Sequence, residues 1–148
     1  SHPGAVKIRA PKASPEIVSW ALDKYGVYAG DTITATLVVR NKGGQPGTMR
    51  LKGFIYYYGG YYDGQYAGRF TKRNKDYCSA SKESDWDYVD SYLQPGESKT
   101  VNMYKANVAC GQNTAFDNGQ RFTIDWMLTC RETGETDTEE GYFRYFRR

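Results

Sequence analysis

Residues 31–40 read DTITATLVVR, and apolar side chains occupy every second position of this stretch. The positions between them carry three threonines and, at the end, Arg40. Successive side chains of a strand point to opposite faces, so this alternation predicts a strand with one face buried and the other in water. The expected inward positions are Ile33, Ala35, Leu37 and Val39.

The same alternation returns near the end of the chain, in residues 121–131, RFTIDWMLTCR. Trp126 is the expected core anchor, because a buried indole removes a large apolar area from water. Two one-sided strands so far apart in sequence predict two sheets that face each other across one core. The expected inward positions of the second strand are Phe122, Ile124, Trp126, Leu128 and Cys130.

Shorter runs of the same kind, separated by Gly, Pro, Asn and Asp, complete an all-β prediction. No stretch has a convincing helical period. Seven or eight short strands at this spacing are typical of a sandwich or a small barrel, and the sandwich is favoured. The expected strands cover residues 17–22, 31–40, 49–58, 61–71, 87–93, 98–105, 122–130 and 141–147, with an acidic turn over residues 133–139.

The chain divides into an extended N-terminal leader, residues 1–15, and one sandwich domain, residues 16–148. The leader holds three of the five prolines together with small and basic residues. No segment approaches the roughly 20 apolar residues of a membrane-spanning helix. The first residues also lack the apolar block of a signal peptide, a segment that is removed from a mature secreted protein.

Residues 15–44 read PEIVSWALDKYGVYAGDTITATLVVRNKGG, and residues 93–101 read LQPGESKTV. In both stretches a Gly-containing turn leads into an alternating strand. Both resemble the cell-adhesion-related Ig-like domains of prokaryotic surface proteins, a CARDB-like, fibronectin-type group. The resemblance implies an immunoglobulin-like antiparallel β-sandwich of seven to eight strands, acting as a spacer, adhesion or assembly module on the cell surface. Residues 56–92 depart from the family pattern as an expanded Tyr-rich hairpin and a long loop.

The residue types needed for catalysis or metal binding are few or scattered. The one histidine is His2, in the leader, which gives no Ser-His or Cys-His pair with a strand residue. Asp85 and Asp87 are close enough in sequence to flank a glycosidic bond, and two acidic segments carry oxygens suited to calcium, but neither has EF-hand spacing. These segments are Asp85, Asp87 and Asp90, and Glu132, Glu135, Asp137, Glu139 and Glu140. The prediction is a non-enzymatic protein with no metal and no cofactor.

Three cysteines leave one unpaired if two form a disulfide. Cys130 has the inward parity of its strand, where a free thiol packs like a small hydrophobic side chain. Cys78 and Cys110 lie near loops and strand ends, so a Cys78–Cys110 disulfide in an oxidising compartment is the favoured hypothesis. Three free thiols in a cytosolic protein are the alternative, since spacing alone does not give disulfide geometry.

The densest group of tyrosines lies in the central hairpin, between residues 56 and 66. If Tyr57 points into the core, its neighbours point out of it, because strand side chains alternate. Exposed tyrosines favour protein interfaces and stacking on sugars. A covering loop, or cross-strand pairing alone, would make them purely structural. The hypothetical binding surface is Tyr56, Tyr58, Tyr61, Tyr62 and Tyr66.

Charge gives a weaker indication of the partner. The net charge of +3 does not indicate a polyanion, and no nucleic acid is expected. Residues 1–75 carry 12 basic and 4 acidic side chains, whereas residues 76–148 carry 8 and 13, an asymmetry that suits head-to-tail association.

The leading prediction is therefore a non-enzymatic extracellular or surface module for structure or adhesion. Its expected partner is another protein or copies of itself, contacted through the Tyr-rich hairpin. The extended leader is suited to adding a strand to the open sheet edge of a neighbour. The alternatives are a carbohydrate-binding module that uses the same tyrosines, and a viral or other coat component.

Overall fold

A computed structural model describes residues 12–58, 64–74, 84–108 and 116–147 of the chain. These residues form nine strands and no helix, which confirms the all-β prediction. The strands are β1 (Pro15–Leu22), β2 (Gly26–Tyr28), β3 (Ile33–Asn41), β4 (Gly47–Tyr58), β5 (Tyr66–Arg69), β6 (Val89–Leu93), β7 (Ser98–Lys105), β8 (Gln120–Cys130) and β9 (Thr136–Phe146).

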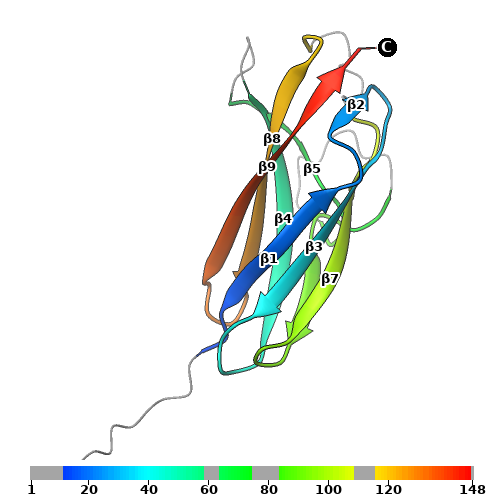
Figure 1. Cartoon of the computed structure of the whole chain (residues 1–148). Coiled ribbons are helices and arrows are strands. Elements are labelled where there is room, and N and C mark those ends of the chain that lie inside the picture. The colour runs from blue at the N-terminus through cyan, green and yellow to red at the C-terminus, as the bar shows by residue number, and fades with distance from the viewer. Residues whose placement is uncertain (1–11, 59–63, 75–83, 109–115, 148) are drawn as a thin grey trace, which may run out of the picture.

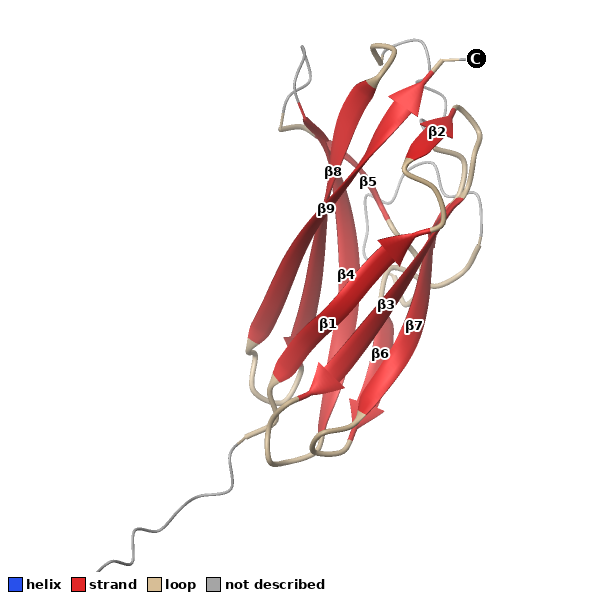
Figure 2. Cartoon of the chain, in the orientation of Figure 1, coloured by secondary structure: helices blue, strands red, loops and turns tan. Residues whose placement is uncertain are grey.

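The strands form two open sheets. The first has the order β1-β3-β7, and both of its ladders are antiparallel. The second has the order β2-β9-β8-β4-β5, with β6 also paired to β4 beyond the end of β5. All of its ladders are antiparallel except the short parallel pairing of β2 with β9. The two sheets lie face to face as two layers (Figures 1 and 2).

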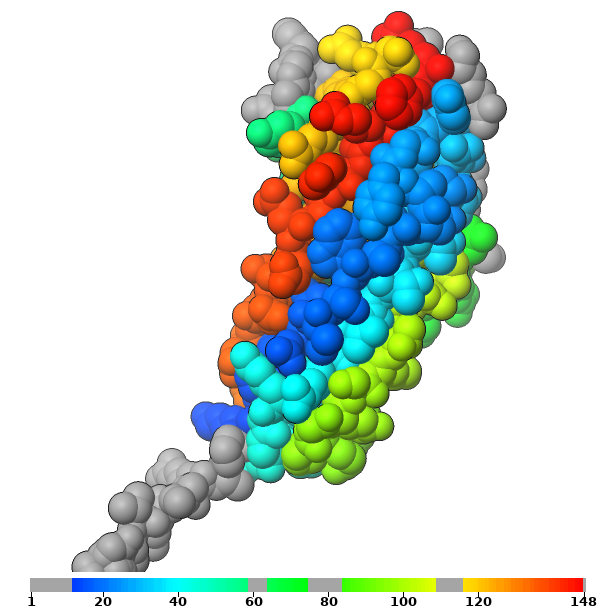
Figure 3. Space-filling model, in the orientation of Figure 1, coloured from blue at the N-terminus to red at the C-terminus, as the bar shows by residue number. Residues whose placement is uncertain are grey.

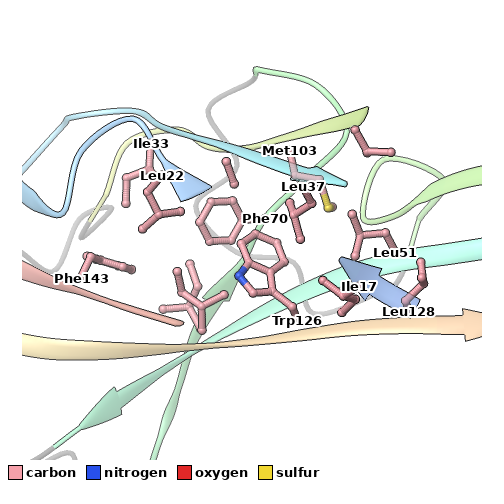
Figure 4. Close-up of a cluster of buried hydrophobic side chains, with 14 of the residues drawn as sticks. Ile17, Leu22, Ile33, Leu37, Leu51, Phe70, Met103, Trp126, Leu128 and Phe143 are labelled. Carbon is pink, nitrogen blue, oxygen red and sulfur yellow. The ribbon is translucent and has the colours of Figure 1, made fainter. Parts of the chain in front are cut away.

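The core lies between the layers and is built from the positions that alternation predicts. Ile33, Leu37, Ile124 and Trp126 are fully buried. Side chains from both sheets meet around the indole of Trp126 (Figure 4). The centroid of the Phe70 ring lies 4.7 Å from that of Trp126. The every-second-residue pattern of β3 and β8 is therefore confirmed as the pattern of burial.

The backbone of β4 makes room for the tryptophan at Gly53. Gly53 and Trp126 are register partners, and a Cβ atom on Gly53 would lie 2.4 Å from Cζ3 of the indole. Cβ atoms do not approach other atoms so closely, so the indole can pack this close to β4 only where the side chain is a hydrogen atom.

Three elements differ from the sequence predictions. The strand predicted over residues 61–71 is too long, because β5 runs only from Tyr66 to Arg69 among the described residues. β2 was not predicted, because three residues are too few for a periodic pattern to be recognised. The predicted acidic turn over residues 133–139 is wrong in extent, because β9 already begins at Thr136. Its first residues are exposed or half-buried, and their polar side chains hide the strand from a search for alternating apolar positions.

The last residues before β1 are held against the domain. Ala13 is buried, and the carbonyl of Lys12 accepts a hydrogen bond from the amide of Gly44. The amide of Ser14 donates to the side chain of Asn41, which is itself buried. The chain is therefore fixed to the β3–β4 turn before β1 begins.

Gly53→Ala is expected to lower the free energy of unfolding by about 1–3 kcal/mol, since the new methyl group forces the indole or β4 to move. The free energy is measured by urea denaturation followed by tryptophan fluorescence and circular dichroism.

The matched control is a double-mutant cycle, in which Gly53→Ala is also made in the Trp126→Phe background. Trp126→Phe replaces the indole by a smaller ring. In the double variant the alanine is expected to cost less than in the wild-type background, because the two sites are in contact. Equal costs in both backgrounds would mean that the indole does not limit the side chain at position 53.

Candidate functional site

The outer face of the six-stranded sheet carries an unusual set of side chains where β4, β5, β8 and β9 lie side by side. Ile55 and Tyr57 of β4 point into the core, and the alternate positions therefore point out. Neighbouring strands in register add further aromatic rings and guanidinium groups. We call this set the aromatic–arginine face: Phe54, Tyr56, Tyr58, Tyr66, Arg69, Arg121, Tyr142 and Arg144.

Arg121 lies at the centre of one group. Its guanidinium carbon is 4.5 Å from the centroid of Tyr58 and 4.1 Å from that of Tyr142. The two rings come from the strands on either side of β8, so the arginine is stacked against both neighbours. Its Nε atom is buried and has no hydrogen-bond partner among the described residues. Stacking on two rings restricts the side chain without using its hydrogen-bond donors.

Arg69 organises a second group on the edge strand β5. Its Nε atom donates a hydrogen bond of 3.0 Å to the hydroxyl of Tyr66, and its guanidinium carbon lies 5.3 Å from the ring of Phe54. Tyr66 in turn meets the ring of Tyr56 edge to face, with centroids 5.9 Å apart. Arg69 also pairs with the buried carboxylate of Asp87, at 3.3 Å. These contacts hold the rings in fixed orientations.

Two shallow depressions border this face. One of about 300 Å³ lies at the end of β4 and β8, and the other, of about 460 Å³, lies over the middle of β8 and β9. The first contains two arginines and one carboxylate, whereas the second contains three carboxylates and no basic group. The first is lined by Tyr58, Asp117, Asn118, Gly119, Gln120, Arg121 and Arg144, and the second by Asp125, Met127, Thr138, Glu139 and Glu140.

The structure brings three of the five predicted surface tyrosines together. Tyr58 and Tyr66 are 54% and 44% exposed, and Tyr56 is half-buried beside Tyr66. Tyr57 is buried, as its parity predicts if it points into the core. Tyr61 and Tyr62 lie outside the described residues.

Sequence reasoning did not connect the hairpin tyrosines with the residues that complete the face from other strands. Arg121 and Tyr142 are more than 60 residues away from Tyr58 in sequence, and Tyr142 is 49% exposed. Their outward parity is visible in the sequence, but the register that places them beside Tyr58 is not.

Most of the acidic side chains considered as calcium ligands instead bind the protein's own groups. Asp87 accepts from Arg69 and from the amide of Ser84. Asp90 forms a two-point ion pair with Arg50, at 2.8 and 2.9 Å. Glu135 and Asp137 accept from the hydroxyl of Ser14 and the amide of Ile17, respectively. No group of three or more His, Cys, Asp or Glu within the described ranges is placed to hold a metal ion.

Cys78 and Cys110 both lie outside the described residues, so their predicted disulfide stays a hypothesis. Cys130 is a buried free thiol, as its inward parity predicts, and its Sγ atom donates to Glu132 at 3.6 Å. Among the residues with described structure, no helix has the length and apolar character needed to cross a membrane.

No protein-family model matches the chain, and no curated protein matches it. Solved structures do share its fold. The alkylpurine DNA glycosylase AlkC of Pseudomonas fluorescens, bound to DNA with an abasic site analog, superimposes with a TM-score of 0.60 at 12% identity, over 90% of this chain and 31% of that chain. The sporulation control protein Spo0M from Bacillus subtilis gives a TM-score of 0.53 at 14% identity, over 95% of this chain and 51% of that chain.

A β-glucuronidase of Bacteroides uniformis gives a TM-score of 0.55 at 14% identity, over 83% of this chain and 12% of that chain. The chain thus spans from about an eighth to about half of the length of these proteins. At such low identity the likeness shows the fold alone, which many unrelated functions share.

One acidic residue is expected to make stability depend on pH. The pKa of Glu132 is lowered from its ordinary value of 4.5, mainly because its carboxylate accepts a hydrogen bond of 2.7 Å from the amide of Thr48. A lowered pKa stabilises the fold above the ordinary value, and this contribution is lost as the pH falls through the folded-state pKa. The urea midpoint is therefore expected to decrease below about pH 4.5, and less so in Glu132→Gln.

The neutral amide of Glu132→Gln keeps an acceptor for Thr48 but does not titrate. The midpoints of the two proteins are compared between pH 6 and pH 3. Identical pH profiles would contradict the role given to this carboxylate.

Proposed function

We propose that this chain is a non-enzymatic, Ig-like structural or adhesion module of a surface assembly, and that the aromatic–arginine face contacts another protein. The strand order supports the Ig-like part of the proposal. In immunoglobulin sandwiches strands A, B and E share one sheet, and strands C, F and G share the other. Here β1, β3 and β7 take the places of A, B and E, and β4, β8 and β9 take those of C, F and G.

The step from β1 to β2 also supports this assignment. After Leu22 the chain leaves the three-stranded sheet, and β2 pairs in parallel with the last strand, β9. Figure 3 shows the N-terminal strand lying alongside β9, where the two sheets meet. A first strand divided between both sheets closes one side of the sandwich. This topology agrees with the resemblance of residues 15–44 to surface Ig-like domains.

The observation that carries the functional proposal is the composition of the outer face. A sheet face exposed only to water favours polar side chains, whereas this one presents Tyr58, Tyr66 and Tyr142 at 44–54% exposure. Tyrosine and arginine are enriched at the energetically important centres of protein interfaces. Here they are held by stacking and hydrogen bonds, so little side-chain entropy remains to be lost on binding.

The non-enzymatic part of the proposal rests on the hydrogen bonds and ion pairs that the acidic side chains form within the protein. The carboxylates of Asp87, Asp90 and Asp137 bind the protein's own amides and arginines. General acid–base chemistry needs such groups to face a substrate instead. The sole histidine, His2, lies outside the described residues.

The proposed location is outside the cytoplasm, with a Cys78–Cys110 disulfide. Under denaturing, non-reducing conditions, alkylation of the native material is expected to label Cys130 alone. Peptide mass spectrometry would find the other two cysteines in one linked species. Labelling of all three cysteines in freshly isolated material would contradict both the disulfide and the oxidising compartment that it requires.

The contact surface can be mapped by hydroxyl-radical footprinting of the native material, compared with the isolated folded chain. Tyr58, Tyr66 and Tyr142 are expected to be oxidised several-fold more slowly in the native material, because a partner covers them. Tyr25 and Tyr92 serve as internal controls, since they are 49% and 62% exposed and lie outside the aromatic–arginine face. Equal oxidation of all five tyrosines in both samples would overturn the proposed contact surface.

The same tyrosines also suit a carbohydrate, which is the second candidate. The observation that favours it is the open depression beside Tyr58, where a ring borders polar groups of Asp117, Asn118 and Gln120. A glycan array probed with the isolated chain and with Tyr58→Ala distinguishes the candidates. Saturable glycan binding that is lost in Tyr58→Ala would favour a sugar-binding module over a protein-binding one.

A further inference from the structure

Two rows of charge cross β8 and β9 on the outer face of the six-stranded sheet. Arg121 of β8 lies directly opposite Arg144 of β9. Four residues further along β8, Asp125 lies directly opposite Glu140. Like charges on directly opposite residues of an antiparallel pair destabilise the sheet. The sheet therefore carries two unfavourable like-charged pairs, one basic and one acidic, and the fold explains neither of them.

None of these four side chains forms an ion pair among the described residues. The guanidinium of Arg121 stacks on two rings, and Arg144 donates one hydrogen bond to the carbonyl of Gly119. The rows also lie too far apart to neutralise each other. Four residues of a strand span roughly 13 Å, well beyond the reach of an ion pair.

We propose that a second copy of this chain covers the face, with the basic row of each copy lying over the acidic row of the other. The proposal rests on the proposed function and names the partner that it leaves open. A two-fold axis in the plane of the interface, perpendicular to the strands, produces this arrangement. The axis passes over Thr123 and Tyr142, which are register partners midway between the two rows.

This symmetry places β8 over β8 and β9 over β9. Arg121 then faces Asp125 of the second copy, and Arg144 faces its Glu140. Each contact occurs twice, because a two-fold interface is self-complementary. Tyr142, which is 49% exposed, lies at the centre and packs near its own symmetry mate. An exposed aromatic ring surrounded by paired charges is a common arrangement for an interface centre.

The alternation of charge argues against other partners. A uniformly acidic protein or an acidic glycan would be attracted by Arg121 and Arg144 but repelled by Asp125 and Glu140. A uniformly basic partner would be attracted by Asp125 and Glu140 but repelled by Arg121 and Arg144. A partner must match both signs at a spacing of four residues, and a second copy in two-fold register does so by symmetry.

The test is a charge exchange between two double variants, R121E/R144E and D125R/E140R. Wild type is expected to form dimers at concentrations up to about 1 mM, as measured by sedimentation equilibrium. Each double variant alone is expected to self-associate at least about tenfold more weakly, because every cross-interface pair becomes like-charged. A one-to-one mixture of the two variants is expected to regain dimerisation, since all of those pairs then have opposite charge.

Circular dichroism and the thermal midpoint of each variant verify that it is folded, and the regained dimer in the mixture is itself a control for folding. A monomeric wild type, or a mixture that stays monomeric, overturns the two-fold arrangement. If hydroxyl-radical footprinting of the native material still shows slower oxidation of Tyr58, Tyr66 and Tyr142, the proposed function survives and the partner is a different protein. If these tyrosines are oxidised equally fast in the native material and the isolated chain, both proposals fail.

Discussion

The fold depends on the packing of the Trp126 indole against the bare backbone of Gly53. The two residues are register partners in the centre of the six-stranded sheet, and the indole fills the space between the layers. Shifting β8 by one residue would turn Trp126 toward water and place Lys52 or Phe54, instead of Gly53, opposite it. This single contact therefore fixes both the register of β4 with β8 and the face that each strand buries.

The outer face follows from that constraint. With Trp126 facing inward, Arg121 and Asp125 must face outward, because they lie an odd number of residues away. The register of β8 with β4 and β9 then decides that Arg121 lies between Tyr58 and Tyr142. The aromatic–arginine face is thus a consequence of core packing, although none of its residues lies in the core cluster.

Alternating apolarity predicts the burial of Ile33 and Trp126, because periodicity in a strand reports its own two faces. It says much less about the site, because Tyr58, Arg121 and Tyr142 meet through hydrogen-bond register between strands distant in sequence. β2 is too short to show a period, and the polar first residues of β9 show none. The family resemblance covers residues 15–44 and 93–101, so it includes no residue of the aromatic–arginine face.

The remaining question is whether the unpaired rows on β8 and β9 are merely tolerated. The same sheet shows that it can neutralise charge across its strands. Arg50 of β4 and Asp90 of β6 are register partners, and they form a two-point ion pair on the outer face. Exchanging Arg144 with Glu140 would give β8 and β9 the same complementarity within one chain. The observed arrangement instead leaves both signs available outside the chain, at the spacing that a two-fold copy matches.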